Sequence, residues 1–111
     1  MLPERDRLYL RDMLYYANQA LDFVNDKTLE DLTKDIRTQL ALERCIEIIG
    51  EAAKTVSAET KDKLPDLPWQ DIARTRDFFA HHYFKIDLNI MWQIVGHDLP
   101  ALVGQLEQLI E

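Results

Sequence analysis

The chain has 111 residues, of which 47% are hydrophobic and 30% charged, as is usual for one globular domain. We therefore expect residues 1–111 to form a single domain, without room for separate cofactor and substrate domains. No apolar run approaches the roughly 18 residues that cross a bilayer, and the charged N-terminus does not resemble a signal peptide. These features predict a cytoplasmic protein that makes no membrane contact.

The charge balance limits the kinds of partner that the surface can bind. Thirteen basic and 20 acidic residues give a net charge of −7, which disfavours a protein that coats nucleic acid with its whole surface. The least acidic window is residues 72–86, where three basic residues and two histidines accompany one aspartate. Any contact with nucleic acid is therefore expected to be local.

The apolar residues recur every three or four positions, which is the spacing of amphipathic helices. Three long stripes are present, from Leu10 to Val24, from Leu42 to Val56 and from Met91 to Leu109. The charged residues 5–7, before the first stripe, are interpreted as a solvated, ion-paired helix start. The pattern predicts an all-α fold, an antiparallel bundle of four to five helices.

Capping residues predict where these helices begin and end. Residues 28–31 resemble a capping box, which starts a short helix or leads into the second long one. Pro68 suits the first turn of a third helix, and Asp87 suits the cap of the last one. Because Pro100 interrupts the last stripe, a kink or restart is expected between Gly96 and Pro100.

Two features of the second stripe predict how the helices pack. Gly50 lies in the middle of this helix, where glycine is unfavourable, and indicates a close crossing with another helix. The single cysteine, Cys45, is expected to be a buried and unreactive thiol.

Helices of 20 residues are about 30 Å long, more than a compact monomer of this size needs, so dimerisation through a helix face is expected.

Residues 74–87 concentrate groups that are suited to phosphate chemistry. Arg76 offers a bidentate fork to a phosphate, His81 titrates near neutral pH, and Tyr83 carries a hydroxyl. On a continuous helix Arg76 and Tyr83 share a face, whereas Arg76 and His81 are about 140° apart. Either the helix ends near His81, or the two groups meet across a dimer axis. The competing interpretation is a solvated cluster that compensates the dipole at a helix C-terminus.

A metal site and a cofactor are not predicted. His81 and His82 are neighbours that point to different faces of a helix, and no carboxylate converges with His97. His97, next to Asp98, is interpreted as a helix-break residue without a catalytic role. The sequence contains no glycine-rich phosphate loop, zinc spacing or serine nucleophile motif.

The sequence from Arg76 to Tyr83, RDFFAHHY, matches the R-x4-H-x-Y motif of the HepT-like branch of the HEPN superfamily. Other segments resemble the same family in the same order. They are the first-helix signature at residues 9–14, the IGEAAK segment at 49–54, the PW entry at 68–73 and the next helix start at 87–92. The resemblance therefore extends over nearly the whole chain.

This resemblance implies an all-α HEPN bundle that forms a homodimer and acts as a metal-independent ribonuclease toxin. The implied partner is an MntA-like minimal nucleotidyltransferase, an antitoxin that silences the toxin by transferring AMP to Tyr83. Arg76 and His81 would be the catalytic pair, and Asp77 occupies a position that is often Asn in the family. There the Asp77 carboxylate either orients Arg76 or His81, or weakens the binding of RNA. Further candidates for contacts with RNA phosphates are Arg74, His82 and Lys85.

Two alternatives to a ribonuclease remain open from the sequence. One is a non-catalytic HEPN helical module that docks a nucleotidyltransferase, in which Arg76 binds a nucleotide phosphate. The other is a plain structural dimer of helices. Substitution of His81 distinguishes a ribonuclease from both alternatives, because only a ribonuclease loses cleavage.

Overall fold

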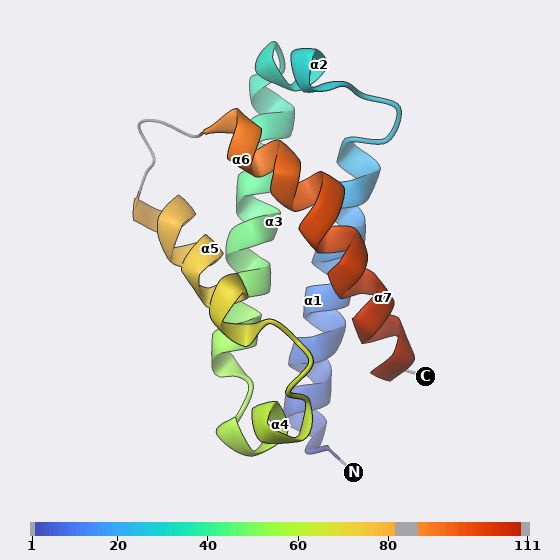
Figure 1. The fold of residues 1–111 in the computed structure, drawn as a ribbon, viewed down its shortest axis with the longest axis vertical. Helices are drawn as coiled ribbons and strands as arrows, with labels where there is room; N and C mark the ends of the chain where they lie inside the picture. Colours follow the sequence, from blue (N-terminus) through green and yellow to red (C-terminus); the bar gives the residue numbers. More distant parts are fainter. Residues whose placement is uncertain (1, 82–86, 110–111) are drawn as a thin grey trace.

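The computed structural model describes residues 2–81 and 87–109, and within these residues every regular element is helical. The long helical segments run alternately up and down, and short helices cover the ends (Figure 1). The prediction of an all-α bundle is therefore confirmed for the described residues. The elements are α1 (Glu4–Phe23), α2 (Leu29–Thr33), α3 (Ile36–Thr55), α4 (Ala58–Lys63), α5 (Trp69–His81), α6 (Leu88–Gln93), η1 (Ile94–Asp98) and α7 (Leu99–Leu109).

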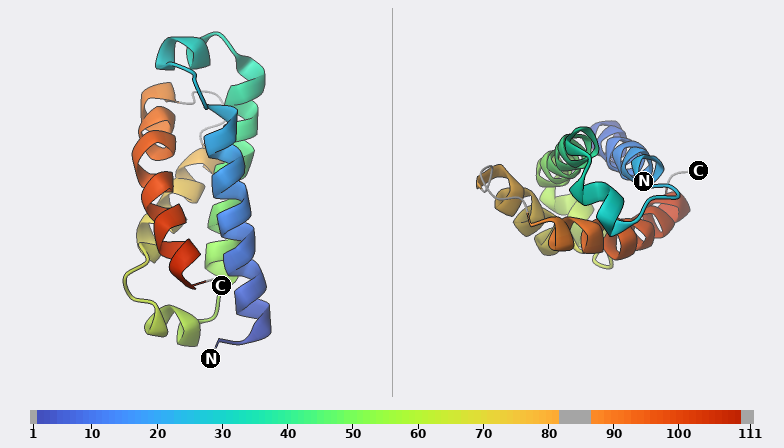
Figure 2. Two further views of the ribbon diagram at one scale, coloured as in Figure 1. Left: turned by 90° about the vertical axis from the view of Figure 1, so that its right-hand side faces the viewer. Right: turned by 90° about the horizontal axis from the view of Figure 1, so that it is seen from above.

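The helices form two layers, which Figure 2 shows from the side and from above. Helices α1 and α3 make one layer, and α5 makes the other together with the continuous run of α6, η1 and α7. Between the layers, α5 packs on α3 and α7 packs on α1. The helix that carries the R-x4-H motif is therefore supported by α3.

The core lies where the three predicted stripes meet. All five stripe positions of α3, from Leu42 to Val56, are buried, and the last stripe is buried from Met91 to Leu106. Leu109, at the end of that stripe, is 40% exposed because the bundle ends there. In α1 the buried apolar residues are Leu10, Met13, Ala17 and Ala20, so its inner face is rotated slightly from the predicted stripe.

The predicted helix boundaries are confirmed at three places. Thr28 and Asp31 form a reciprocal capping box, with N–O distances of 2.9 and 3.1 Å, and it begins the short helix α2. The Asp87 carboxylate caps α6 by accepting hydrogen bonds from the backbone N–H groups of Asn89 and Ile90. The irregularity expected before Pro100 is the π-helical turn η1, as is typical where proline cannot continue the regular hydrogen bonding.

The prediction of a solvated helix start is wrong for Asp6, although its neighbours Arg5 and Arg7 are exposed. Asp6 is only 3% exposed, and its carboxylate accepts hydrogen bonds from the Ser57 N–H (3.1 Å), the Ser57 hydroxyl (2.6 Å) and the Thr60 hydroxyl. These hydrogen bonds lower the pKa of Asp6. Local sequence does not reveal them, because the donors lie at the start of α4, more than 50 residues away.

Cys45 is buried in α3, which confirms the prediction of a buried thiol, and burial raises the pKa of this thiol. In the parts of the chain that the structure describes, no helix combines the length and the apolar character needed to cross a bilayer.

Candidate active site

Helix α5 positions the residues of the R-x4-H motif. It begins at Trp69, directly after Pro68 as predicted, and the Trp69 indole donates a hydrogen bond to the Leu64 carbonyl (2.9 Å). Phe79 anchors the other end of α5 in the core with 2% exposure. Because α5 extends to His81, the backbone positions of Arg76 and His81 belong to one helix, five residues apart.

Part of the predicted site lies outside the described residues. This applies to His82, Tyr83 and Lys85, and also to the side chain of His81, of which only the backbone in α5 is described. The geometry between the Arg76 and His81 side chains therefore stays a prediction, and so does the role of Tyr83.

Arg76 lies where α5 crosses α3 at Gly50. A Cβ atom on Gly50 would lie 2.1 Å from the Arg76 Cβ and 2.5 Å from its Cγ, far inside van der Waals contact. The predicted close crossing at Gly50 is thus confirmed. The stem of the arginine occupies the space that any larger residue at position 50 would fill.

Four charged side chains of alternating sign extend from this crossing, and we call them the charge chain: Glu51, Arg76, Asp77 and Lys54. The Arg76 Nη1 atom donates a hydrogen bond to Asp77 Oδ1 (3.1 Å), and its Nη2 atom lies 3.9 Å from Glu51 Oε1. The Lys54 Nζ atom lies 3.6 Å from the same Asp77 oxygen. The charge chain therefore links α3 to α5, and its formal charges cancel.

The hydrogen bonds of Arg76 are incomplete in this arrangement. Its Nε atom is buried, and it has no hydrogen-bond partner within residues 2–81 and 87–109. The contact with Glu51 is long, and the Glu51 side chain is half exposed. The hydrogen bond from Arg76, and to a smaller extent the charge of Lys54, hold the pKa of Asp77 below its usual value. Asp77 is therefore ionised at neutral pH, and it contacts Arg76 directly.

The sequence analysis did not assign a role to Glu51 or Lys54, although both lie in the IGEAAK segment. The available signal was their spacing. Glu51 directly follows Gly50 at the crossing, and Lys54, three residues after Glu51, lies on the same helix face. Arg74, in contrast, does not join the charge chain. Its guanidinium is paired with Asp71 and its side chain is 73% exposed.

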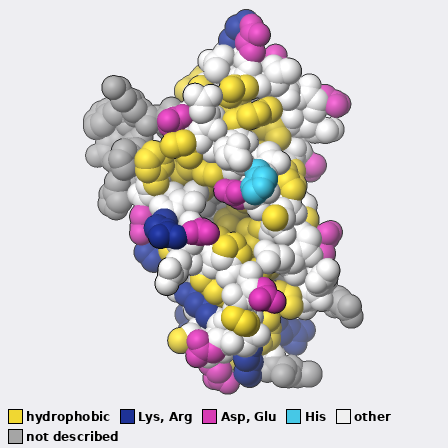
Figure 3. All heavy atoms as spheres, viewed as in Figure 1, with side chains coloured by type: hydrophobic (Ala, Val, Ile, Leu, Met, Phe, Trp, Pro, Cys, Tyr) yellow, Lys and Arg dark blue, Asp and Glu magenta, His cyan; other side chains and the backbone are white. Residues whose placement is uncertain are grey.

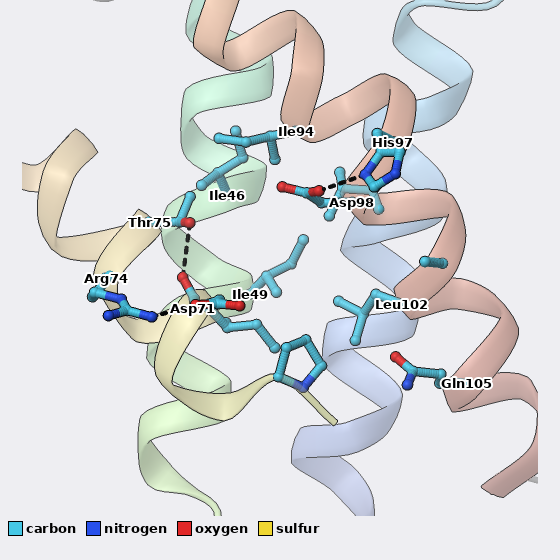
Figure 4. Close-up of a pocket in the computed structure, with 14 residues that line it drawn as sticks. Ile46, Ile49, Asp71, Arg74, Thr75, Ile94, His97, Asp98, Leu102 and Gln105 are labelled. Atoms are coloured by element: carbon cyan, nitrogen blue, oxygen red, sulfur yellow. Dashed lines mark hydrogen bonds and ion pairs between the residues drawn. The ribbon is translucent and has the colours of Figure 1, made fainter. Parts of the chain in front are cut away.

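Arg74 instead borders a groove between α5 on one side and η1 and α7 on the other, with a volume of about 420 Å³. Hydrophobic side chains gather on this face of the molecule (Figure 3), and Ile46, Ile49 and Leu102 line the groove. Figure 4 shows the Asp71–Arg74 pair on one wall and the His97–Asp98 pair, 2.9 Å apart, on the opposite wall. In the described part of the chain, no three metal-ligating side chains converge.

Comparison with known proteins agrees with the motif. The family model described as "Ribonuclease HepT-like" matches residues 13–109. The chain belongs to this family. The match includes the Gly50 crossing, the charge chain and the R-x4-H-x-Y motif of this HepT-like chain.

Several curated proteins are similar to this HepT-like chain over most of its length. "Putative RNase MJ0127" of Methanocaldococcus jannaschii is 39% identical over 111 residues, which cover 99% of this chain and 92% of the relative. "Probable ribonuclease HepT" of Thermococcus cleftensis is 38% identical over 101 residues, 91% of this chain and 92% of the relative. "Putative RNase TTE0752" of Caldanaerobacter subterraneus is 32% identical over 105 residues, 95% and 94% of the two chains. No solved structure matches.

Proposed function

We propose that this HepT-like endoribonuclease cleaves RNA without a metal ion, with Arg76 and His81 as its catalytic pair, and that residues 1–111 act as one domain. The observation that carries the proposal is the position of Arg76. It is the motif arginine, it is fixed against Gly50 at the crossing of α5 and α3, and its guanidinium has a buried donor that finds no partner among the residues that the structure describes.

In the proposed reaction the 2′-hydroxyl oxygen of the RNA attacks the adjacent phosphorus, and the bond from phosphorus to the 5′-oxygen breaks. The products are a 2′,3′-cyclic phosphate and a 5′-hydroxyl. His81 either accepts the proton of the 2′-hydroxyl or supplies a proton to the leaving 5′-oxygen. Proton transfer of this kind is typically worth about 10²–10⁴-fold in rate. Arg76 holds the phosphate and stabilises the additional charge of the transition state.

The charge chain explains how Arg76 is available for this task. The contact between Arg76 and Glu51 is 3.9 Å long, and the Asp77 carboxylate is half exposed. Neither carboxylate therefore takes up all the hydrogen-bonding capacity of the guanidinium. A guanidinium prefers a bidentate phosphate to one long contact and one single hydrogen bond. Arg76 is thus able to exchange its carboxylate partners for RNA.

A homodimer completes the proposed site. Arg76 and His81 are five residues apart on α5, a spacing of about 140° around an ideal helix, so the spacing by itself does not place them side by side on one copy. A two-fold axis that joins two copies of α5 would place the arginine of one protomer near the histidine of its partner. The same axis would gather cationic groups of an otherwise acidic protein in one cleft.

We further propose that the chain is the toxin of a toxin–antitoxin pair and that it acts in the cytoplasm. An MntA-like minimal nucleotidyltransferase would silence it by transferring AMP to Tyr83. The attached AMP would add bulk and a negative phosphate two residues beyond His81, and Arg76 would bind that phosphate in place of RNA. Replacing Tyr83 by Phe then preserves cleavage and removes the silencing. A Tyr83→Phe protein that is still AMPylated and silenced contradicts this assignment.

The central test is cleavage of RNA in the presence of EDTA by the unmodified protein, with Tyr83 confirmed as free by mass spectrometry. The proposal expects cleavage by the wild type, a loss of about 10²–10⁴-fold in His81→Ala, and no cleavage of DNA, which has no 2′-hydroxyl. His97→Ala is the matched control, because this exposed histidine lies in η1, outside the motif.

The outcome of this test also decides between the alternatives. Cleavage that EDTA abolishes, or cleavage of DNA, contradicts the mechanism. If neither the wild type nor His81→Ala cleaves RNA, while both still bind a nucleotidyltransferase, the chain is a docking module.

A further inference from the structure

Lys54 is the cationic member of the charge chain that comes from outside the motif, and it contacts the motif residue Asp77. Its Nζ atom lies 3.6 Å from Asp77 Oδ1, the same oxygen that accepts the hydrogen bond from Arg76 at 3.1 Å. One carboxylate oxygen thus has two cationic neighbours, one from α5 and one from α3. The Lys54 and Asp77 side chains are 49% and 48% exposed, so RNA has access to this pair.

This pair contributes little to the stability of the fold. Half-exposed ion pairs gain little Coulomb energy, because water screens them and both side chains lose rotamer freedom. The crossing of α3 and α5 is already fixed by Gly50 and the stem of Arg76, which pack directly on each other. A contribution to the stability of the fold therefore does not explain the position of Lys54.

The electrostatics of phosphate binding supply such a reason. When Arg76 turns from Asp77 to an RNA phosphate, the Asp77 carboxylate loses its hydrogen bond and remains negative beside an anionic ligand. That repulsion opposes binding unless another cation stays on the carboxylate. Lys54 is already in contact with the same oxygen, so the exchange leaves Asp77 paired.

We propose that Lys54 is a positioning residue of the RNA site: it stays paired with the Asp77 carboxylate while the Arg76 guanidinium moves to bind the RNA phosphate. The inference rests on the proposed ribonuclease function and adds to it an electrostatic requirement of this chain, in which a carboxylate, Asp77, directly follows the motif arginine. It explains how a carboxylate next to the phosphate-binding arginine is compatible with the binding of an anion.

The test compares RNA cleavage by the wild type, Lys54→Gln, Asp77→Asn and the double variant. Lys54→Gln is expected to raise KM for RNA about tenfold with little change in kcat, because it affects phosphate binding through Asp77. Asp77→Asn alone leaves KM unchanged or lowers it. The decisive expectation is rescue: Lys54→Gln combined with Asp77→Asn returns KM to within about twofold of Asp77→Asn, since no unpaired carboxylate remains.

Lys63→Gln is the matched control. The Lys63 side chain is 47% exposed and lies 3.5 Å from Glu59, so this lysine resembles Lys54 in exposure and pairing but belongs to α4. Lys63→Gln is expected to leave the KM for RNA at its wild-type value, and Lys54→Arg is expected to do the same. The inference is overturned if Lys54→Gln behaves like the wild type. It is also overturned if the double variant is as weak as Lys54→Gln, because Lys54 then acts on RNA without Asp77.

A second readout keeps this inference separate from the proposed function. If the wild type does not cleave RNA, the proposed function fails. The same substitutions are then placed in a His81→Ala background, and their affinity for mixed-sequence single-stranded RNA is measured. A weakening by Lys54→Gln that Asp77→Asn reverses still supports the role of Lys54, and equal affinities overturn it.

Discussion

Two carboxylates, Asp6 and Asp77, each join a pair of helices, but they do so under opposite conditions. Asp6 links α1 to α4, is 3% exposed and accepts three hydrogen bonds from Ser57 and Thr60. Asp77 links α5 to α3, has a side chain that is 48% exposed, and shares one oxygen between Arg76 and Lys54. The partners of Asp6 are neutral donors, whereas those of Asp77 are cations.

This difference separates a structural cluster from one that is available to a ligand. A buried carboxylate that accepts hydrogen bonds from fixed neutral donors keeps these partners, since each donor left unpaired would cost free energy. A half-exposed carboxylate between two cations exchanges partners with little loss, because water replaces the lost contact. The donor of Arg76 that has no partner among the described residues lies in the second cluster. The following predictions test the comparison, from the largest expected effect to the smallest.

Replacing Asp6 by Ala is expected to lower the free energy of unfolding by about 3 kcal/mol, because it leaves the buried Thr60 hydroxyl and two donors of Ser57 without their acceptor. The measurement is urea denaturation followed by circular dichroism. Asp12→Ala, at an exposed position of the same helix, is the control and changes stability by less than about 0.5 kcal/mol. Equal effects of the two substitutions contradict a structural role for the Asp6 cluster.

Replacing Gly50 by Ala is expected to cost about 2 kcal/mol and to reduce RNA cleavage strongly, because the new methyl group displaces Arg76 and α5. This change disturbs the charge chain without altering a charge. Gly104→Ala is the control: nothing lies within 4 Å of its added methyl group, and alanine stabilises a helix interior by up to about 1 kcal/mol. Normal cleavage by Gly50→Ala would show that the crossing does not position Arg76.

The pH dependence of stability is expected to reflect Asp6. The pKa of Asp6 is lower in the folded chain than its ordinary value of 3.8, so the folded state binds its proton less readily than the unfolded state does. Its contribution is therefore fully present above pH 3.8 and decreases as the pH falls through the lower, folded pKa. Accordingly, the difference in stability between the wild type and Asp6→Asn is expected to shrink toward low pH. A difference that stays constant from neutral pH to strongly acidic conditions contradicts this assignment.

The smallest effect on stability is expected for Asp77→Asn. The pKa of Asp77 is also lowered, by the hydrogen bond from Arg76 and by Lys54, but its exposure to water makes that interaction weak. Thermal denaturation of Asp77→Asn is expected to coincide with that of the wild type, while its RNA affinity is unchanged or higher. A clear loss of stability would place Asp77 with Asp6 among the structural carboxylates.

The sequence predicted the parts of this fold that depend on local chemistry. The stripe of α3, the capping box of residues 28–31, the cap at Asp87 and the irregular turn before Pro100 all follow from side chains within a few residues of one another. Gly50 was predictable as a crossing because glycine is unfavourable in a helix interior and a close approach of another helix accounts for its presence there. The motif located the candidate site on α5, and the family predicted from it is confirmed by the family model that matches residues 13–109.

What the sequence did not reveal is which distant charges meet. Asp6 was expected to be solvated because its neighbours Arg5 and Arg7 offered local ion pairs, yet its partners come from the start of α4. Glu51 and Lys54 had no assigned role, since nothing near them in the sequence indicated Arg76 and Asp77 as partners. Arg74 belongs to the basic window of the sequence, but the structure places it at the groove, paired with Asp71.

The sequence by itself thus determined the long helices, the caps at Thr28 and Asp87, the buried faces of α3 and of the last helix, and the family motif, because each depends on interactions over one or two helical turns. The tertiary structure alone decided which carboxylate is buried and which is exposed, and which lysine accompanies the motif arginine. The physical reason is that burial and pairing depend on how helices cross. At Gly50 that crossing brings Lys54 of α3 to Asp77 of α5, next to Arg76.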